Sequence, residues 1–201
     1  MASSSPLSAP ALRRRLALLA IGAAIALLLI VLAVLLASTT VASFTARVVA
    51  GVAFSPTEVD GMIDAEAPLT VDDESHPAMA KLDPALRDAL RAAQAAAHLD
   101  GIRFDVTSGW RSVAYQRWLL DDAIRTYGSE DVAREYVASE DESSHVTGHA
   151  VDIGSLDAQL WLSEHGRAWG LCQTYANERW HFERATEPGG ECPTPHEDAR
   201  G

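Results

Sequence analysis

The longest uninterrupted apolar stretch of the chain lies near its N-terminus. From Leu16 to Ala37 no side chain is charged or strongly polar. A helix over this stretch would be roughly 33 Å long, close to the hydrocarbon core of a bilayer at about 30 Å. Basic residues occupy 13–15 just before it, and none follows until Arg47. The pattern predicts one transmembrane helix over 16–37, with the N-terminus in the cytoplasm and the remainder outside.

A cleaved signal peptide is the competing interpretation of this stretch. The apolar core of a signal peptide usually has about 7–15 residues, which is shorter than the run observed here. A small-residue segment at 41–43 could still be cut. Length favours the uncleaved anchor, and both interpretations export the rest of the chain.

Beyond residue 80, the hydrophobic pattern alternates between helical and extended periods. Asp83 and Pro84 form a typical helix start, an N-cap followed by proline at the first helical position. Helices are expected over 84–99, 112–127, 130–138 and 156–166, and strands over 102–108, 149–154, 171–176 and 179–183. This order predicts an α+β domain with a small, mainly antiparallel sheet flanked by helices.

The same patterns predict a division of the chain into five parts. They are a cytoplasmic N-terminus at 1–15, the anchor at 16–37, an extracytoplasmic stalk at 38–80, the folded domain at 81–187 and a tail at 188–201. The stalk is expected to have weak local structure, because its residues are mixed and interrupted by Pro56 and Pro68.

The exported part is strongly acidic. Residues 1–15 hold three of the 16 basic residues and none of the 28 acidic ones, which leaves 13 against 28 and a net charge of −15. Such a surface argues against nucleic acid and against anionic polymers as partners held by bulk charge. In an oxidising compartment, Cys172 and Cys192 are expected to form a disulfide rather than a redox or metal pair.

A metal site is the main chemical prediction. His145 and Asp152 flank Gly148 in one segment, and Glu178 precedes His181 by three residues in another. Two imidazoles and a carboxylate suit Zn²⁺, and three protein ligands leave a fourth position open, as in catalytic sites. Glu178 would then be free to act as a general base.

Two simpler interpretations compete with a metal site. Asp152 could instead cap the helix that starts after Ser155, with both histidines in ordinary positions. A serine hydrolase using Ser144, His145 and Asp152 is disfavoured, because adjacent Ser and His side chains cannot easily reach triad geometry and the chain has no GxSxG elbow. The remaining histidines are expected to be ordinary surface or packed residues: 76, 98, 149, 165 and 196.

Three blocks of the chain, in order, resemble one enzyme family. They are Ser108-Gly109-Trp110-Arg111-Ser112 with Gln116, then Ser143-x-His145-x-x-Gly148-x-Ala150-x-Asp152, then Glu178-x-x-His181. This pattern, over about residues 82–184, resembles the zinc D-Ala-D-Ala carboxypeptidases and dipeptidases, which include enzymes of vancomycin resistance and are related to hedgehog and lysostaphin-type zinc peptidases. The short segment between Gly170 and Glu178 departs from many relatives and borders the expected substrate groove.

The resemblance implies a role for each matching residue. His145, Asp152 and His181 would bind zinc, Glu178 would be the general base, and Arg111 would stabilise the oxyanion. Ser143 and Gln116 would hold the terminal carboxylate of the substrate.

The expected activity is that of a membrane-anchored, extracytoplasmic zinc carboxypeptidase that removes terminal D-alanine from peptidoglycan stem peptides. A dipeptidase or endopeptidase on the same scaffold is the close alternative. A non-catalytic binding module that keeps its metal is the alternative from another class, and the presence of Glu178 favours catalysis.

Overall fold

The computed structural model describes residues 27–28, 31–33 and 54–201. Within these residues, no helix is both long and apolar enough to cross a membrane. The predicted cytoplasmic segment at 1–15 lies outside the described residues, and so does the anchor at 16–37 except for five exposed helical residues. Residues 54–201 form one compact unit.

This unit is an α+β fold, as predicted, and its sheet has four antiparallel strands in the order β1-β2-β4-β3. The strands are β1 (Val106–Ser108), β2 (Ala150–Ile153), β3 (Leu171–Gln173) and β4 (His181–Arg184). The α-helices are α2 (Pro77–Ala80), α3 (Pro84–Ala97), α4 (Val113–Tyr127), α5 (Glu130–Ala133) and α6 (Leu156–His165). Short 3-10 turns are η1 (Glu58–Asp60), η2 (His98–Asp100) and η3 (Gly166–Trp169).

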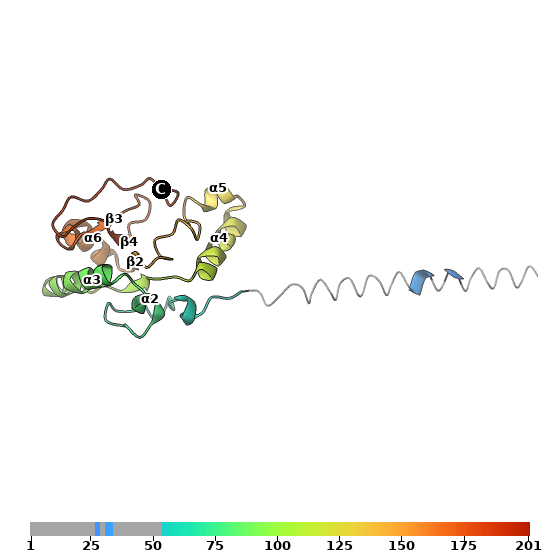
Figure 1. Ribbon diagram of the computed structural model, residues 1–201, viewed down its shortest axis with the longest axis horizontal. Coiled ribbons are helices and arrows are strands. Elements are labelled where there is room, and N and C mark those ends of the chain that lie inside the picture. The colour runs from blue at the N-terminus through green and yellow to red at the C-terminus, as the bar shows by residue number, and fades with distance from the viewer. Residues whose placement is uncertain (1–26, 29–30, 34–53) are drawn as a thin grey trace, which may run out of the picture. The chain divides into compact units, whose positions relative to one another are not determined.

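The helices divide into two groups around the sheet (Figure 1). α3 and α6 contact the strands, and their apolar faces join β1, β2 and β4 in the main core, with Leu90, Phe104 and Phe182 fully buried. α4 and α5 pack on each other around a separate small cluster that includes Leu120 and Ala133.

Side-chain caps fix where the helices begin. The carboxylate of Asp83 accepts hydrogen bonds from the backbone N–H groups of Ala85 and Leu86, and the Ser112 hydroxyl accepts one from Tyr115. Ser155 caps α6 through the N–H of Ala158. Asp152 is therefore free of the capping role that the simpler interpretation gave it.

Several boundaries differ from the prediction. The compact unit begins at Phe54, so the second half of the predicted stalk is folded: Val71 and Met79 lie in the main core, and Leu69 exchanges backbone hydrogen bonds with Val106. These apolar residues are sparse and follow neither the helical nor the strand period, so the hydrophobic pattern did not predict their burial. β1 covers only Val106–Ser108 of the predicted 102–108, and α5 ends five residues before the predicted 138.

The predicted tail at 188–201 is attached to the unit at several points. A disulfide joins Cys172 of β3 to Cys192, as expected from the sequence. His196 forms a parallel bridge with Tyr175, and Ala199 is buried. The segment after Cys192 is therefore part of the fold rather than a free extension.

Gly148 explains the spacing between His145 and Asp152. It has φ +76°, a conformation that favours glycine, and a Cβ there would lie 2.4 Å from the carbonyl oxygen of Lys81. Its own carbonyl accepts a hydrogen bond from the N–H of Asp83. The loop can therefore turn tightly against the start of α3 and deliver His145 to the same place as β2 delivers Asp152.

Candidate metal centre

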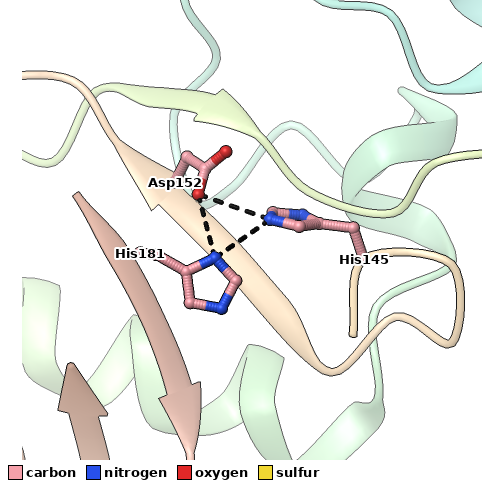
Figure 2. Close-up of side chains that lie close together, drawn as sticks. All are labelled: His145, Asp152 and His181. Atoms are coloured by element: carbon pink, nitrogen blue, oxygen red, sulfur yellow. Dashed lines mark hydrogen bonds and ion pairs between the residues drawn. The ribbon is translucent and has the colours of Figure 1, made fainter. Parts of the chain in front are cut away.

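Three side chains from separate elements converge on one point (Figure 2). Asp152 on β2 and His181 on β4 are direct cross-strand partners, so their side chains project from the same face of the sheet. His145 reaches this point from the loop before β2. All three are buried, with 3–7% of their surface exposed.

The distances between their ligand atoms fit a single metal ion. His145 Nε2 lies 3.2 Å from His181 Nδ1, and each of these nitrogens lies 3.4 Å from Asp152 Oδ1. Ligands about 2.0–2.1 Å from a tetrahedral zinc lie roughly 3.3 Å apart, which these spacings match. Asp152 Oδ1 is buried and accepts no hydrogen bond from the described residues. Burying a carboxylate oxygen in this way is unfavourable in free energy unless a cation lies beside it.

Hydrogen bonds outside the triangle orient both imidazoles. His145 Nδ1 donates to the carbonyl oxygen of Gly109 at 2.8 Å, which leaves Nε2 to face the metal position. His181 Nε2 donates to Glu183 Oε1 at 2.9 Å, which leaves Nδ1 to face it. Such partners fix the tautomer and raise the basicity of a metal ligand.

Arg111 holds the second oxygen of Asp152. Its Nη2 donates to Asp152 Oδ2 at 2.8 Å, while Nη1 donates to Gln116 at 3.1 Å and Nε to the hydroxyl of Ser108 at 2.8 Å. The observed role of Arg111 is thus to orient a ligand carboxylate. The oxyanion role that the resemblance implies stays a prediction.

Glu178 lies beside His145, Asp152 and His181 but is not part of the group of three. Its Oε2 is 3.7 Å from His181 Nδ1, and its side chain is 11% exposed. Burial raises the pKa of Glu178 to about 7, with the Asp152 carboxylate adding to the rise and His181 opposing it. A carboxyl group that titrates near neutrality suits proton transfer in both directions.

These groups open into a cavity of about 180 Å³. Arg111, Gln116, Ser143 and Glu178 all contribute to its lining. Gln116 is buried and already paired, since its Nε2 donates to the carbonyl of Ala138 at 2.8 Å. The structure therefore brings every predicted site residue to one cavity, whereas the roles of Ser143 and Gln116 toward a substrate stay predictions.

The serine-hydrolase interpretation does not fit this geometry. A triad requires one nitrogen of the histidine to face the serine and the other to face the aspartate. In His145, Nδ1 is bonded to Gly109, and Nε2 faces both His181 and Asp152. Neither nitrogen is directed at Ser144.

Comparison with known proteins agrees with this geometry. The family model described as "VanY: D-alanyl-D-alanine carboxypeptidase" matches residues 79–186, which is more than half of the chain and contains all the site residues. The chain belongs to this family. The resemblance seen in the sequence motifs is thereby confirmed.

The chain is also similar to an individual protein with the same description. A D-alanyl-D-alanine carboxypeptidase of Enterococcus faecalis is 27% identical over 127 residues, 51% of this chain and 46% of that protein. The chain thus spans about half the length of this relative.

Two solved structures illustrate the range of similar folds. A vancomycin-resistance D,D-pentapeptidase VanY variant in complex with Zn(II) is 26% identical, covering 51% of this chain and 71% of that chain at a TM-score of 0.48. DacB from Streptococcus pneumoniae is also 26% identical, covering 58% and 70% at a TM-score of 0.43.

Two contributors to this VanY-family site were missed in the sequence. Glu183 follows His181 by two residues on a strand, a spacing that places both side chains on one face and could have identified it. Tyr175 packs edge-on against His181, with ring centroids 5.0 Å apart, and has no comparable signal in the sequence.

Replacing Glu183 with alanine is expected to weaken zinc binding about 10–100-fold, because His181 would lose the acceptor that orients it. Competition against a zinc indicator would measure the change. Glu187→Ala, which removes an exposed carboxylate paired with Arg184, is the matched control and should leave the affinity unchanged. Equal affinities in Glu183→Ala and the control would contradict this positioning role.

Zinc affinity is expected to increase with pH below about 9. Burial disfavours the His181 cation, but the neighbouring carboxylates of Asp152 and Glu183 outweigh burial and raise the pKa of His181 to about 9. A proton must leave His181 before the metal binds, so the dissociation constant should fall about tenfold per pH unit between pH 6 and 8. Calorimetric titration of metal-free protein would measure this slope.

The exposed His149 provides the control for that slope. Its side chain is 60% exposed and does not line the cavity of the metal centre, so His149→Gln should show the same pH dependence as the unaltered chain. A dissociation constant that does not change with pH would contradict the assignment of the proton to His181.

Proposed function

We propose that the chain is a zinc-dependent carboxypeptidase of the cell envelope that hydrolyses the terminal D-Ala-D-Ala bond of peptidoglycan stem peptides and releases D-alanine. The observation that carries the proposal is the buried Oδ1 of Asp152. It accepts no hydrogen bond from the described residues and faces two oriented imidazole nitrogens, with the Glu178 carboxyl alongside. Membership of the D-alanyl-D-alanine carboxypeptidase family supports the substrate class.

His145, Asp152 and His181 would hold the zinc ion. Two nitrogens and one oxygen form a donor set that zinc accepts in catalytic sites, where an open position remains for water or substrate. When bound, zinc supplies Lewis acidity toward the scissile carbonyl and lowers the pKa of water.

Glu178 would carry the proton in this reaction. Its carboxylate accepts a proton from the attacking water and then delivers it to the leaving amine of D-alanine. The buried position of Glu178 supports this role, since a carboxyl group with a pKa near 7 exists in both protonation states at neutral pH. Solvent-exposed glutamates lack this property.

The cavity lining would bind the peptide. The guanidinium of Arg111 is held in place by hydrogen bonds to Ser108, Gln116 and Asp152. Its positive charge would therefore be in position beside the metal without a side-chain movement during the reaction. Ser143 and Gln116, which line the same cavity, would hold the terminal carboxylate of the substrate.

We also propose that the enzyme works outside the cytoplasm, tethered by the apolar segment at 16–37. The disulfide between Cys172 and Cys192 supports an oxidising compartment. A membrane tether would keep the site close to a substrate that is assembled at the outer face of the membrane.

Product identity tests the proposed reaction. The full-length, zinc-loaded chain is incubated with a stem pentapeptide ending in D-Ala-D-Ala, and mass spectrometry follows the products. The expected result is a tetrapeptide and free D-alanine, with no reaction after chelation. Release of the intact D-Ala-D-Ala dipeptide would identify an endopeptidase that cuts the preceding bond, and the absence of cleavage in a folded, zinc-loaded chain would contradict a carboxypeptidase acting on this peptide.

A further inference from the structure

The segment after the disulfide follows the loop between β3 and β4. Its start is covalently fixed, because Cys192 is bonded to Cys172 in β3. Farther along, the N–H of His196 donates to the carbonyl of Thr174, and the N–H of Ala176 donates to the carbonyl of His196, both at 2.8 Å. The segment therefore lies beside the turn that leads to Glu178.

The same segment then reaches the turn after α5. The carbonyl of Glu135 accepts hydrogen bonds from the N–H of Ala199 at 3.4 Å and from Asn177 Nδ2 at 2.8 Å. Arg200 adds an ion pair to the Glu135 carboxylate at 3.7 Å. Figure 1 shows this course, from the β3 side of the sheet toward α5. The segment thus joins two loops that are far apart in the sequence.

Ala199 lies where these two loops meet, and it lines the cavity of the metal centre. It is only 5% exposed, and Tyr136 and Tyr175 line the same cavity. Tyr175 is joined to the segment through its bridge with His196. The ring of Tyr175 in turn contacts the imidazole of His181. One residue therefore separates this segment from a predicted metal ligand.

The cavity is also small. Its volume of about 180 Å³ is below the roughly 300–1,000 Å³ of ordinary small-molecule sites. Ala199 is buried and its N–H donates to the carbonyl of Glu135, so at this position the lining cannot make room by rotating a side chain.

We propose that residues 196–199 form a specificity-determining wall, with Ala199 limiting the size of the substrate group that enters beside the metal. The wall admits a peptide that ends in a small residue such as D-alanine and excludes a bulkier terminal residue. This inference rests on the proposed function, because it concerns the substrate of the same site.

The test compares two stem pentapeptides, one ending in D-Ala-D-Ala and one ending in D-Ala-D-Leu. The ratio of their kcat/KM values is measured for the full chain, for a truncation ending at Asp198 and for a truncation ending at Pro195. Both truncations keep Cys192, and the shorter deletion also keeps the backbone bridge of His196 to Tyr175. Glu191→Gln, which alters an exposed residue just before Cys192 and outside the proposed wall, is the matched control.

The full chain is expected to prefer the D-Ala-D-Ala peptide, and each truncation should reduce that preference at least tenfold through a lower KM for the D-Leu peptide. Calorimetric binding of the two peptides should change in the same direction. If the longer deletion fails to fold, the truncation at Asp198 decides the question. An unchanged ratio in a folded, zinc-loaded truncation, or an equal change in Glu191→Gln, overturns the proposed wall.

Failure of the wall and failure of the proposed function give different results. A full chain that cleaves neither peptide contradicts the proposed function. A full chain that releases D-alanine, with truncations of the same preference, contradicts only the role of residues 196–199.

Discussion

Glu178→Gln is expected to reduce kcat for D-alanine release by about 10²–10⁴-fold while the protein keeps its zinc. The amide cannot accept the proton of the attacking water, yet it has nearly the same size and leaves His145, Asp152 and His181 in place. Steady-state kinetics and zinc content, measured on the same preparation, would separate the two effects. KM should change little, because Glu178 acts on the reacting atoms rather than on the body of the peptide.

Glu187→Gln is the control for this experiment, since Glu187 pairs with Arg184 on the surface and does not line the cavity. It should retain full activity and zinc. Equal loss of zinc and turnover in Glu178→Gln would show that Glu178 is a metal ligand and not the base.

Asp152→Ala is expected to abolish tight zinc binding and to destabilise the metal-free fold as well. Asp152 Oδ2 is the anionic partner of Arg111 at 2.8 Å, and both side chains are largely buried, so the substitution leaves a guanidinium unpaired. Breaking a buried ion pair costs roughly 3–5 kcal/mol. We expect about 3 kcal/mol, the lower end of that range, because the substitution also removes the unpaired Oδ1.

Urea denaturation of metal-free protein would measure this loss. Asp72→Ala, which breaks an exposed pair with Arg91, is the matched control and should change the free energy of unfolding by less than about 1 kcal/mol. A similar small change in Asp152→Ala would show that the ion pair with Arg111 contributes little to the fold.

The sequence predicted those parts of the fold and site that depend on local signals. Asp83 and Pro84 predicted the start of α3, and Ser155 predicted the cap of α6. The group of His145, Asp152 and His181 could be predicted because the first two lie with Gly148 in one short segment, and because Glu178 and His181 lie three residues apart in a second segment. The α+β class followed from the order of the periodic segments.

Features that depend on distant contacts could not be predicted in this way. Val71 and Met79 enter the core from a segment without periodicity, and the segment around Ala199 reaches the cavity only because the disulfide and Glu135 hold it there. The pairing of Arg111 with Asp152 joins residues 41 positions apart, for which neither neighbourhood carries a signal. In each case tertiary packing decides the structure.

Zinc titration of D-alanine release from a stem pentapeptide tests the central claim most directly. Metal-free, full-length protein receives increasing zinc, and the rate is followed together with bound metal. The account predicts no release without metal, a rate that rises in proportion to bound zinc, and saturation at about one ion per chain, as one set of three ligands requires. Release of D-alanine that persists without metal, or a folded chain that binds one zinc and releases none, would contradict it.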